Sequence, residues 1–296
     1  MILKILFITT ALASSSTKVE LGKKLFFDKR LSGNNQMSCA TCHRPEFGWT
    51  DGVPLAIGNQ NKILLRKTPT VAYLDDDKVF FWDGRSSSLE QQAIIPLTSP
   101  DEMNQNIIEL IGELESIPEY RDNFLELYPI EGISQHTIID AIVSFEKSLN
   151  KRNSPFDKYI NGDQLAISQS AKNGYSTFST LKSNCLFCHK GSDFTDQKLW
   201  DVGVSGSDSG RNGEFLFKTA SLRDVALRKN FFHNGSYKSL YEVIKFYSRG
   251  GDVHRPTQSP HQRPSIDLSE KEIYEVIEFL KSLTGETHLI ATPKIP

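Results

Sequence analysis

The stretch Cys39-Ala40-Thr41-Cys42-His43 recurs as Cys185-Leu186-Phe187-Cys188-His189, and the expected fold follows from these two copies. Two cysteines separated by two residues and followed directly by histidine are typical of covalent attachment of c-type haem. Each thiol adds to one vinyl group of the porphyrin, and the next histidine is placed to ligate the iron. We therefore expect two c-type haems, the first held by Cys39, Cys42 and His43 and the second by Cys185, Cys188 and His189.

A four-cysteine zinc site or a pair of disulfides is the alternative, because Cys-x-x-Cys also serves zinc ribbons and redox centres. These four cysteines are the only ones in the chain. With 7 histidines in 296 residues, both second cysteines would precede a histidine by chance with a probability of about 0.0006. The pattern thus favours haem over zinc or disulfides.

Length and composition indicate a globular chain of two domains. The 296 residues are about twice a typical domain, and the two motifs lie 146 residues apart. Hydrophobic residues at 38% and charged residues at 24% fit a globular protein. A net charge of −2, without a basic patch interleaved with aromatic residues, argues against nucleic-acid binding.

Residues 1–13 have the pattern of a short secretory signal. One early lysine, Lys4, precedes a short apolar run that ends in the small-residue site Ala11-Leu12-Ala13. The run is far shorter than the roughly 20 residues that span a bilayer, so we expect no membrane span after cleavage. Since haem attachment of this kind is usually completed outside the cytoplasm, we expect a periplasmic protein.

Hydrophobic spacing predicts a mainly α architecture with few strands. Ser134, Ser168 and Ser269 have the character of N-caps, and Ser269 forms a capping box with Glu272. We expect helices over 19–26, 107–114, 118–128, 134–149, 168–181, 239–248 and 269–283.

The polar stretch 150–163 is the best candidate for a domain boundary. It would divide the mature chain into two cytochrome c-like helical domains, 14–155 and 156–296, each with one haem. A helix leads into each haem motif, so the second half repeats the plan of the first.

With these motifs, Phe81-Trp82-Asp83-Gly84-Arg85 and Phe231-Phe232-His233-Asn234-Gly235-Ser236 complete a pattern that resembles the bacterial dihaem cytochrome c peroxidases and their MauG-like relatives. The resemblance covers nearly the whole mature chain. It implies that hydrogen peroxide reacts at the first haem and that a tryptophan, matched here by Trp82, lies between the two haems. Read alone, Trp82 would be ordinary core packing.

The resemblance also implies that Gln92, Pro96 and Glu102 cover the distal face of the first haem. Peroxide cleavage needs a group that takes a proton from one oxygen and returns it to the other, and Glu102 can do so if a dry pocket raises its pKa. Gln92 would orient peroxide or water. Read alone, Glu102 is an acid in the first turn of the helix that follows.

Two departures from the peroxidase pattern favour the MauG-like branch. Where reductively activated peroxidases carry a histidine that closes the peroxide site, this chain has Asn59, and no histidine lies between His43 and His136. We therefore expect a first haem that is five-coordinate or water-bound in the diferric state. Fourteen residues after His233, where the peroxidases supply methionine to the second haem, stands Tyr247, the match to the tyrosine of the MauG branch. Tyr247 could instead continue the apolar stripe of its helix.

A third departure concerns calcium, which family members often hold between the domains through an asparagine side chain. Here Lys67 precedes Thr68-Pro69-Thr70. A lysine offers no oxygen and carries a positive charge, which counts against calcium.

Arg85 and Arg223 are candidates to pair with haem propionates, with structural salt bridges as the alternative. The resemblance implies that His233 lies near the second haem without ligating the iron, whereas a histidine beside Phe231 and Phe232, read alone, is more often a hydrogen-bonded core group.

The leading functional hypothesis is a periplasmic MauG-like dihaem peroxidase that reduces hydrogen peroxide at the first haem and draws electrons through the second from a protein partner. The first alternative is a cytochrome c peroxidase that scavenges peroxide with a small cytochrome or copper protein as donor. The second is a dihaem electron-transfer cytochrome without enzymatic activity. A monomer or a homodimer is expected.

Overall fold

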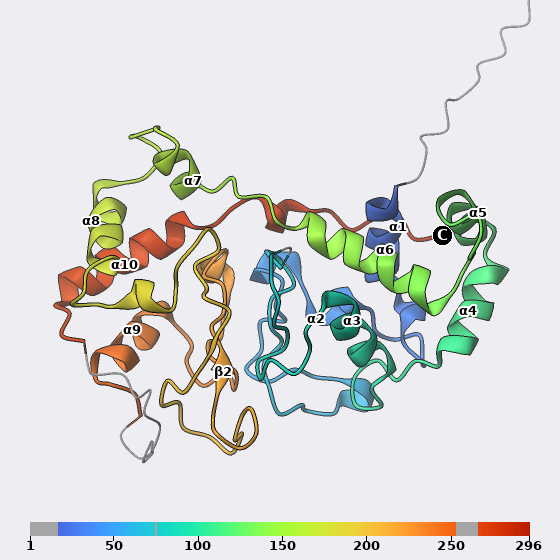
Figure 1. Ribbon diagram of the computed structural model, residues 1–296, viewed down its shortest axis with the longest axis horizontal. Helices are drawn as coiled ribbons and strands as arrows, with labels where there is room; N and C mark the ends of the chain where they lie inside the picture. Colours follow the sequence, from blue (N-terminus) through green and yellow to red (C-terminus); the bar gives the residue numbers. More distant parts are fainter. Residues whose placement is uncertain (1–16, 75, 253–265) are drawn as a thin grey trace, which may run out of the picture.

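The computed structural model describes residues 17–74, 76–252 and 266–296. The expected secretory signal at 1–13 lies outside the described residues. Two groups of helices stand side by side, one built from the first half of the chain and one from the second (Figure 1).

The architecture is mainly α, as predicted. The first group of helices comprises α1 (Lys18–Phe27), α2 (Cys39–Cys42), α3 (Leu89–Thr98), α4 (Ile107–Ser116), α5 (Pro118–Leu127) and α6 (Gln135–Ser148). The second comprises α7 (Pro155–Ile160), α8 (Gln169–Phe178), α9 (Leu240–Ser248) and α10 (Glu270–Ser282). The strands β1 (Leu199–Trp200) and β2 (Phe217–Lys218) form an antiparallel pair in which Leu199 lies opposite Lys218. Short 3-10 turns occur at Lys29–Leu31, Pro45–Phe47, Asn59–Asn61, Cys185–Phe187, Val225–Leu227 and Thr287–Leu289.

Side-chain caps fix the starts of the predicted helices. The Ser134, Ser168 and Ser269 hydroxyls each accept a hydrogen bond from a backbone N–H in the first helical turn, and Ser269 with Glu272 completes the expected capping box. Helix α8 ends at Phe178, however, so the predicted extension to Leu181 is wrong, and that side chain is 95% exposed. Helices α3 and α7 were not predicted.

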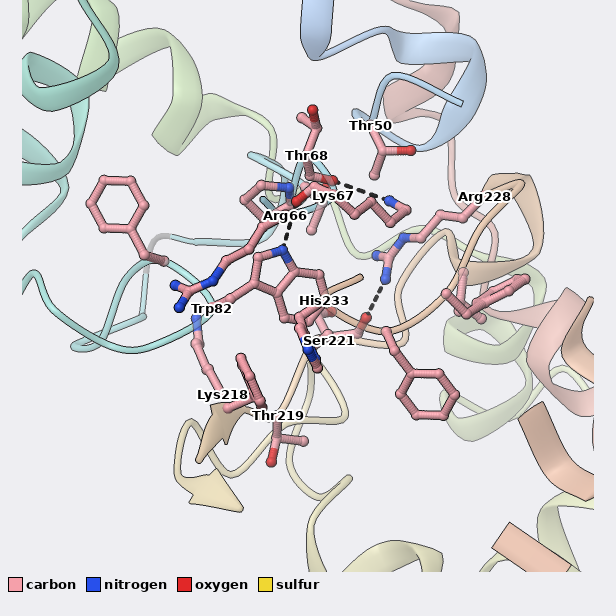
Figure 2. Close-up of a pocket in the computed structure, with 18 of the residues that line it drawn as sticks. Thr50, Arg66, Lys67, Thr68, Trp82, Lys218, Thr219, Ser221, Arg228 and His233 are labelled. Carbon is pink, nitrogen blue, oxygen red and sulfur yellow. Dashed lines mark hydrogen bonds between the residues drawn. The ribbon is translucent and has the colours of Figure 1, made fainter. Parts of the chain in front are cut away.

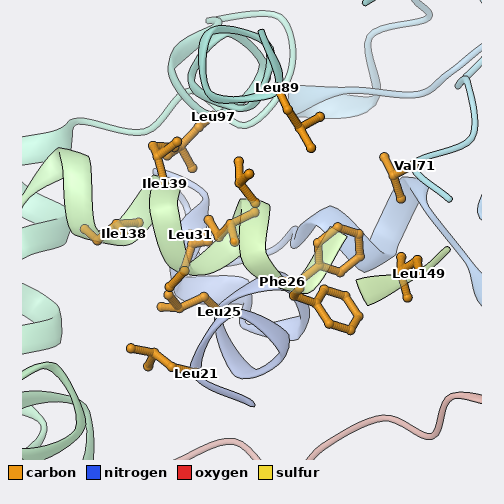
Figure 3. Packing of buried hydrophobic residues seen from close by; sticks show 14 of the residues in the cluster. Leu21, Leu25, Phe26, Leu31, Val71, Leu89, Leu97, Ile138, Ile139 and Leu149 are labelled. Carbon is orange, nitrogen blue, oxygen red and sulfur yellow. The ribbon is translucent and has the colours of Figure 1, made fainter. Parts of the chain in front are cut away.

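Each half has its own hydrophobic core. Buried residues between Leu21 and Leu149 form the first, in which α1 packs on α6 (Figure 3). Buried residues between Phe156 and Leu283 form the second, in which α8 packs on α10. The interval between the cores coincides with the polar stretch 150–163, and we propose that 14–155 and 156–296 are the two domains.

The two cores use the same close helix crossing. A methyl group added at Gly22 of α1 would overlap the carbonyl oxygen of Ala141 in α6. A methyl group at Gly174 of α8 would likewise overlap the carbonyl oxygen of Glu275 in α10. In both halves, therefore, glycine lets the helix before the haem motif approach the backbone of its partner.

The end of the chain returns to the first half. After α10 the chain crosses back and ends beside α5 (Figure 1). Ile290 packs against the first core, and Arg30 donates a hydrogen bond to the carbonyl oxygen of Pro296 at 2.9 Å. The C-terminal segment thus ties the two halves together. Among the described residues, no helix has the length and apolar character needed to cross a bilayer.

Candidate active site

The first motif is a single helical turn that ends on its histidine. Helix α2 spans Cys39–Cys42, and His43 is its C-cap. The Nδ1 atom of His43 lies 3.2 Å from the carbonyl oxygen of Trp49, which can only accept, so Nδ1 carries the proton. The lone pair is then on Nε2, the arrangement that ligation of iron requires. Burial lowers the pKa of His43, which favours the neutral ring.

The second motif reproduces this arrangement. The Nδ1 atom of His189 lies 2.9 Å from the carbonyl oxygen of Phe194. Both carbonyls belong to residues with a left-handed backbone, φ 62° at Trp49 and φ 53° at Phe194. Phe26 lies 6.2 Å from the His43 ring, and Phe178 lies 6.5 Å from the His189 ring. The two histidines therefore have matched surroundings in two separate cores.

A cavity of about 800 Å³ joins the two motifs. Of the thirteen residues predicted for the site, twelve line it, namely Cys39, Cys42, His43, Trp82, Arg85, Gln92, Pro96, Glu102, Cys185, Cys188, His189 and Tyr247. Its two ends lie in different halves of the chain, since Cys39 packs on the first core and Cys185 on the second.

This separation does not fit a single four-cysteine zinc site. A large cavity, mostly apolar, with a Cys-x-x-Cys-His turn at each end fits two covalently held porphyrins.

The predicted distal residues come from α3 and the turn after it. Gln92 and Pro96 lie one helical turn apart on α3, and both face the cavity. The Oε1 atom of Gln92 is buried without a hydrogen-bond partner among the described residues, as expected of an acceptor aimed at a ligand.

Glu102 lies in the turn between α3 and α4. Helix α4 begins only at Ile107, so Glu102 is outside its first turn and the reading of Glu102 as a helix-dipole residue is not supported. Burial raises the pKa of Glu102, and Asp101 adds to this, while Arg85 opposes it. The carboxyl group therefore has the environment that a proton-transfer residue needs.

Asn59, at the position of the gating histidine, does not line the cavity. Its amide donates to the carbonyl oxygen of Pro100 at 3.2 Å and accepts from Asn34 at 3.2 Å. Its backbone N–H donates to the carbonyl oxygen of Asp101 at 3.0 Å. Asn59 thus braces the turn that carries Glu102.

Trp82 lies where the two halves meet (Figure 2). Its indole Nε1 donates to the carbonyl oxygen of Lys67 at 2.7 Å, and the backbone N–H of Lys67 donates to the carbonyl oxygen of His233 at 2.7 Å. The His233 ring stacks on Phe217 with 3.5 Å between ring centroids. A short chain of contacts therefore runs from Trp82 into the second half.

Tyr247 of α9 lines the second half of the cavity, beside Phe232 at 6.0 Å between ring centroids. Arg85 also faces the cavity, with its guanidinium bonded to Asp83.

Arg223 differs from the other predicted residues. It does not line the cavity, and its guanidinium pairs with Asp157 at 2.7 and 2.8 Å while also donating to the carbonyl oxygen of Ser192. Of the two roles open to Arg223, these contacts favour the structural salt bridge over a propionate partner.

Glu146, which was not among the residues predicted for the site, lines the cavity and is only 4% exposed. Its Oε2 atom has no hydrogen-bond partner among the described residues, and burial raises its pKa to about 8. A signal was available, since Glu146 follows Ile142 by four residues on the apolar face of its helix.

Fold and site together define a dihaem peroxidase of c type. The family described as di-haem cytochrome c peroxidase matches residues 16–165. The methylamine utilization protein MauG of Methylophilus methylotrophus is 37% identical over 94% of this chain and 86% of its own. The cytochrome c551 peroxidase of Pseudomonas aeruginosa is 32% identical over 95% of this chain and 83% of its own.

Among solved structures, a MauG-like protein associated with microbial copper homeostasis superimposes with a TM-score of 0.84 at 29% identity, over 94% of this chain and 92% of its own. The chain belongs to the bacterial dihaem cytochrome c peroxidase and MauG family and is an oxidoreductase. Membership of a peroxidase family does not favour the electron-carrier alternative.

Proposed function

We propose that this chain is a periplasmic MauG-like peroxidase that reduces hydrogen peroxide in its first half and takes electrons from a protein partner through its second half. The observation that carries the proposal is the common cavity, in which Glu102 and Gln92 lie in the half of His43 while Trp82 stands at the border with the other half. The reaction consumes one peroxide, two electrons and two protons, and it releases two waters.

A haem in the first half would supply the iron that binds peroxide and is oxidised by it. The side chains around it would transfer the protons. Glu102 would take a proton from one peroxide oxygen and return it to the leaving oxygen, a role that its raised pKa suits. Gln92 would orient the peroxide through its buried amide. Asn59 does not line the cavity and its amide is bonded to Pro100 and Asn34, which supports a first haem that is open to peroxide in the diferric state.

The route of the electrons separates the two branches of the family. Two MauG proteins at 37% and 38% identity support the MauG-like branch, in which oxidation of a partner protein supplies the electrons. Trp82 is the proposed link between the halves, because it bonds Lys67 at their junction. The scavenging alternative, with a small cytochrome or copper protein as donor, keeps the same first-half chemistry.

We propose Tyr247 as the distal ligand of the second haem, because it lines the same cavity as Cys185 and Cys188, which would hold that haem. A tyrosinate is anionic and hard, so it would favour the ferric state. Tyr247→Phe should change the low-spin absorption spectrum. Tyr241→Phe, on the same helix with its hydroxyl on Glu270, is the matched control, and equal spectra in both variants would contradict the assignment.

A peroxide experiment tests the function directly. The ferric protein is mixed with hydrogen peroxide, with and without a reduced small cytochrome c. We expect a spectral change that persists for minutes without the donor and slow oxidation of the donor. Rapid turnover with the cytochrome would favour the scavenging alternative, and no spectral change at all would contradict both.

Two further proposals concern the protein as a whole. The signal-like pattern of residues 1–13 and the two haem motifs support export to the periplasm. A monomer or a homodimer remains our proposal for the assembly.

A further inference from the structure

Lys67 is an unusual residue for the junction of the two halves, since its side chain is buried with 3% exposure and faces the central cavity. Its ammonium group donates to the carbonyl oxygen of Thr68 at 3.1 Å. Its backbone is bonded to both halves: the carbonyl oxygen accepts a hydrogen bond from the Trp82 indole, and the N–H donates one to the carbonyl oxygen of His233.

Arg228, from the second half, points its guanidinium toward the Lys67 ammonium (Figure 2). It donates to the carbonyl oxygen of Ser221 at 2.8 Å and to the carbonyl oxygen of Arg223 at 2.7 Å. Lys67 and Arg228, which we call the basic pair, thus place two basic side chains in one space, one from each half.

The oxygen atoms around the basic pair are of the kinds that calcium ions take as ligands. Calcium takes six to eight oxygen ligands, drawn from carboxylates, carbonyls and waters. Here the carbonyl oxygens of Thr68, Ser221 and Arg223 already accept from the basic pair. The carboxylate of Asp51 accepts from the Thr68 hydroxyl at 2.5 Å.

Electrostatics also disfavour an added cation. Burial lowers the pKa of Lys67 to about 7, and Arg228 lowers it further, while Asp51 acts in the opposite direction. Lys67 and the Arg228 guanidinium already occupy this space, and a charged guanidinium repels a divalent ion. The residues present therefore do not fit the interdomain calcium ion that the family resemblance implies.

We propose that the basic pair joins the two halves in place of calcium, by donating to carbonyl oxygens that a metal would otherwise bind, so that the position of Trp82 does not depend on a metal ion. The consequence for Trp82 rests on the proposed function, but calcium binding itself does not.

Metal analysis and chelation of the haem-loaded protein test the proposal. After gel filtration in buffer without added calcium, we expect fewer than about 0.1 calcium ions per chain, against about one for a resident ion. The absorption spectrum and the unfolding temperature should not change with a calcium chelator or with added calcium. About one calcium per chain, or an unfolding temperature that falls with chelator and recovers with calcium, would overturn the proposal.

The converse variant replaces both charges with amides. Lys67→Asn combined with Arg228→Gln removes the two basic groups and releases the three carbonyl oxygens, so added calcium should raise its unfolding temperature. Lys229→Asn, an exposed lysine next to Arg228, is the matched control and should not respond. A double variant that folds with both haems and whose unfolding temperature does not change with calcium would contradict the proposal. If the double variant does not fold, the calcium content and chelator response of the wild-type protein test the proposal instead. Neither calcium content nor unfolding temperature depends on peroxide. A result against the proposed peroxidase function can therefore be told apart from a result against the role of the basic pair.

Discussion

Glu102 and Glu146 are two acids on the wall of one cavity, and burial raises the pKa of both. Each also has one neighbour that lowers its pKa, Arg85 for Glu102 and Lys147 for Glu146, and one that raises it, but Glu146 is the more deeply buried and its pKa is raised further, to about 8. Glu102 can therefore lose its proton more readily than Glu146, which suits proton transfer. Glu146 is expected to stay neutral at pH 7.

Glu102→Gln should slow the reaction with peroxide about 10²- to 10⁴-fold, because the amide cannot accept and return a proton. The rate of the spectral change after mixing with peroxide measures this, while the resting spectra of both haems should be unchanged. Glu115→Gln, an exposed acid, is the control. Wild-type rates in the Glu102 variant would rule out its role.

The raised pKa of Glu146 predicts that the stability of the protein depends on pH. Its pKa in the folded protein, about 8, lies above the ordinary value of 4.5, so the folded state binds the proton more tightly. Its contribution to stability is complete below pH 4.5 and is lost as the pH rises to 8. Glu146→Gln should remove this loss, which is at most about 1.4 kcal/mol per pH unit for one proton. Denaturant unfolding between pH 5 and 8 measures it, and equal slopes in variant and wild type would argue against a neutral Glu146.

At the scale of elements, the helix crossings in the two halves predict a pattern of glycine substitutions. Gly22→Ala and Gly174→Ala should each destabilise the protein by roughly 1–3 kcal/mol, because the added methyl groups meet backbone atoms of the partner helix. Gly112→Ala in α4 has open space around it and should stabilise by up to about 1 kcal/mol through helix propensity. Unfolding midpoints give the comparison, and similar values for all three variants would mean that the crossings are not tight.

The sequence predicted the longer helices well because their signals are local. Capping serines and a period of 3.6 residues mark α6 and α10 without knowledge of the rest of the chain. Helix α3 was missed because Pro96 lies inside it, and α7 because its six residues fall in a polar stretch.

Site geometry was predictable only in part. The haem motifs are contiguous in sequence, and the family pattern named residues that do line the cavity, such as Glu102 and Trp82. The left-handed backbone of Trp49 and Phe194 has no sequence signal, since neither is glycine or asparagine. The meeting of Lys67 with Arg228 joins residues far apart in the chain, so no local pattern could show it.

For the whole molecule, the central feature is a cavity that crosses between two cores, with Trp82 at the junction. Trp82→Phe should leave the reaction of peroxide in the first half nearly intact but delay the spectral response of the second haem at least about tenfold. The indole is the proposed link, and its hydrogen bond to Lys67 is lost in phenylalanine. Stopped-flow absorption, read separately at bands of the two haems, measures this. Simultaneous responses at the wild-type rate would exclude Trp82 from the route.

Two porphyrins held by thioether bonds, one in each half, are the central feature proposed for this protein. The direct measurement is the mass and haem absorbance of the protein after denaturation and removal of unbound pigment. We predict two covalently attached haems per chain, falling to one when Cys39 and Cys42 are both replaced by serine. One haem or none in the wild-type protein would contradict the account.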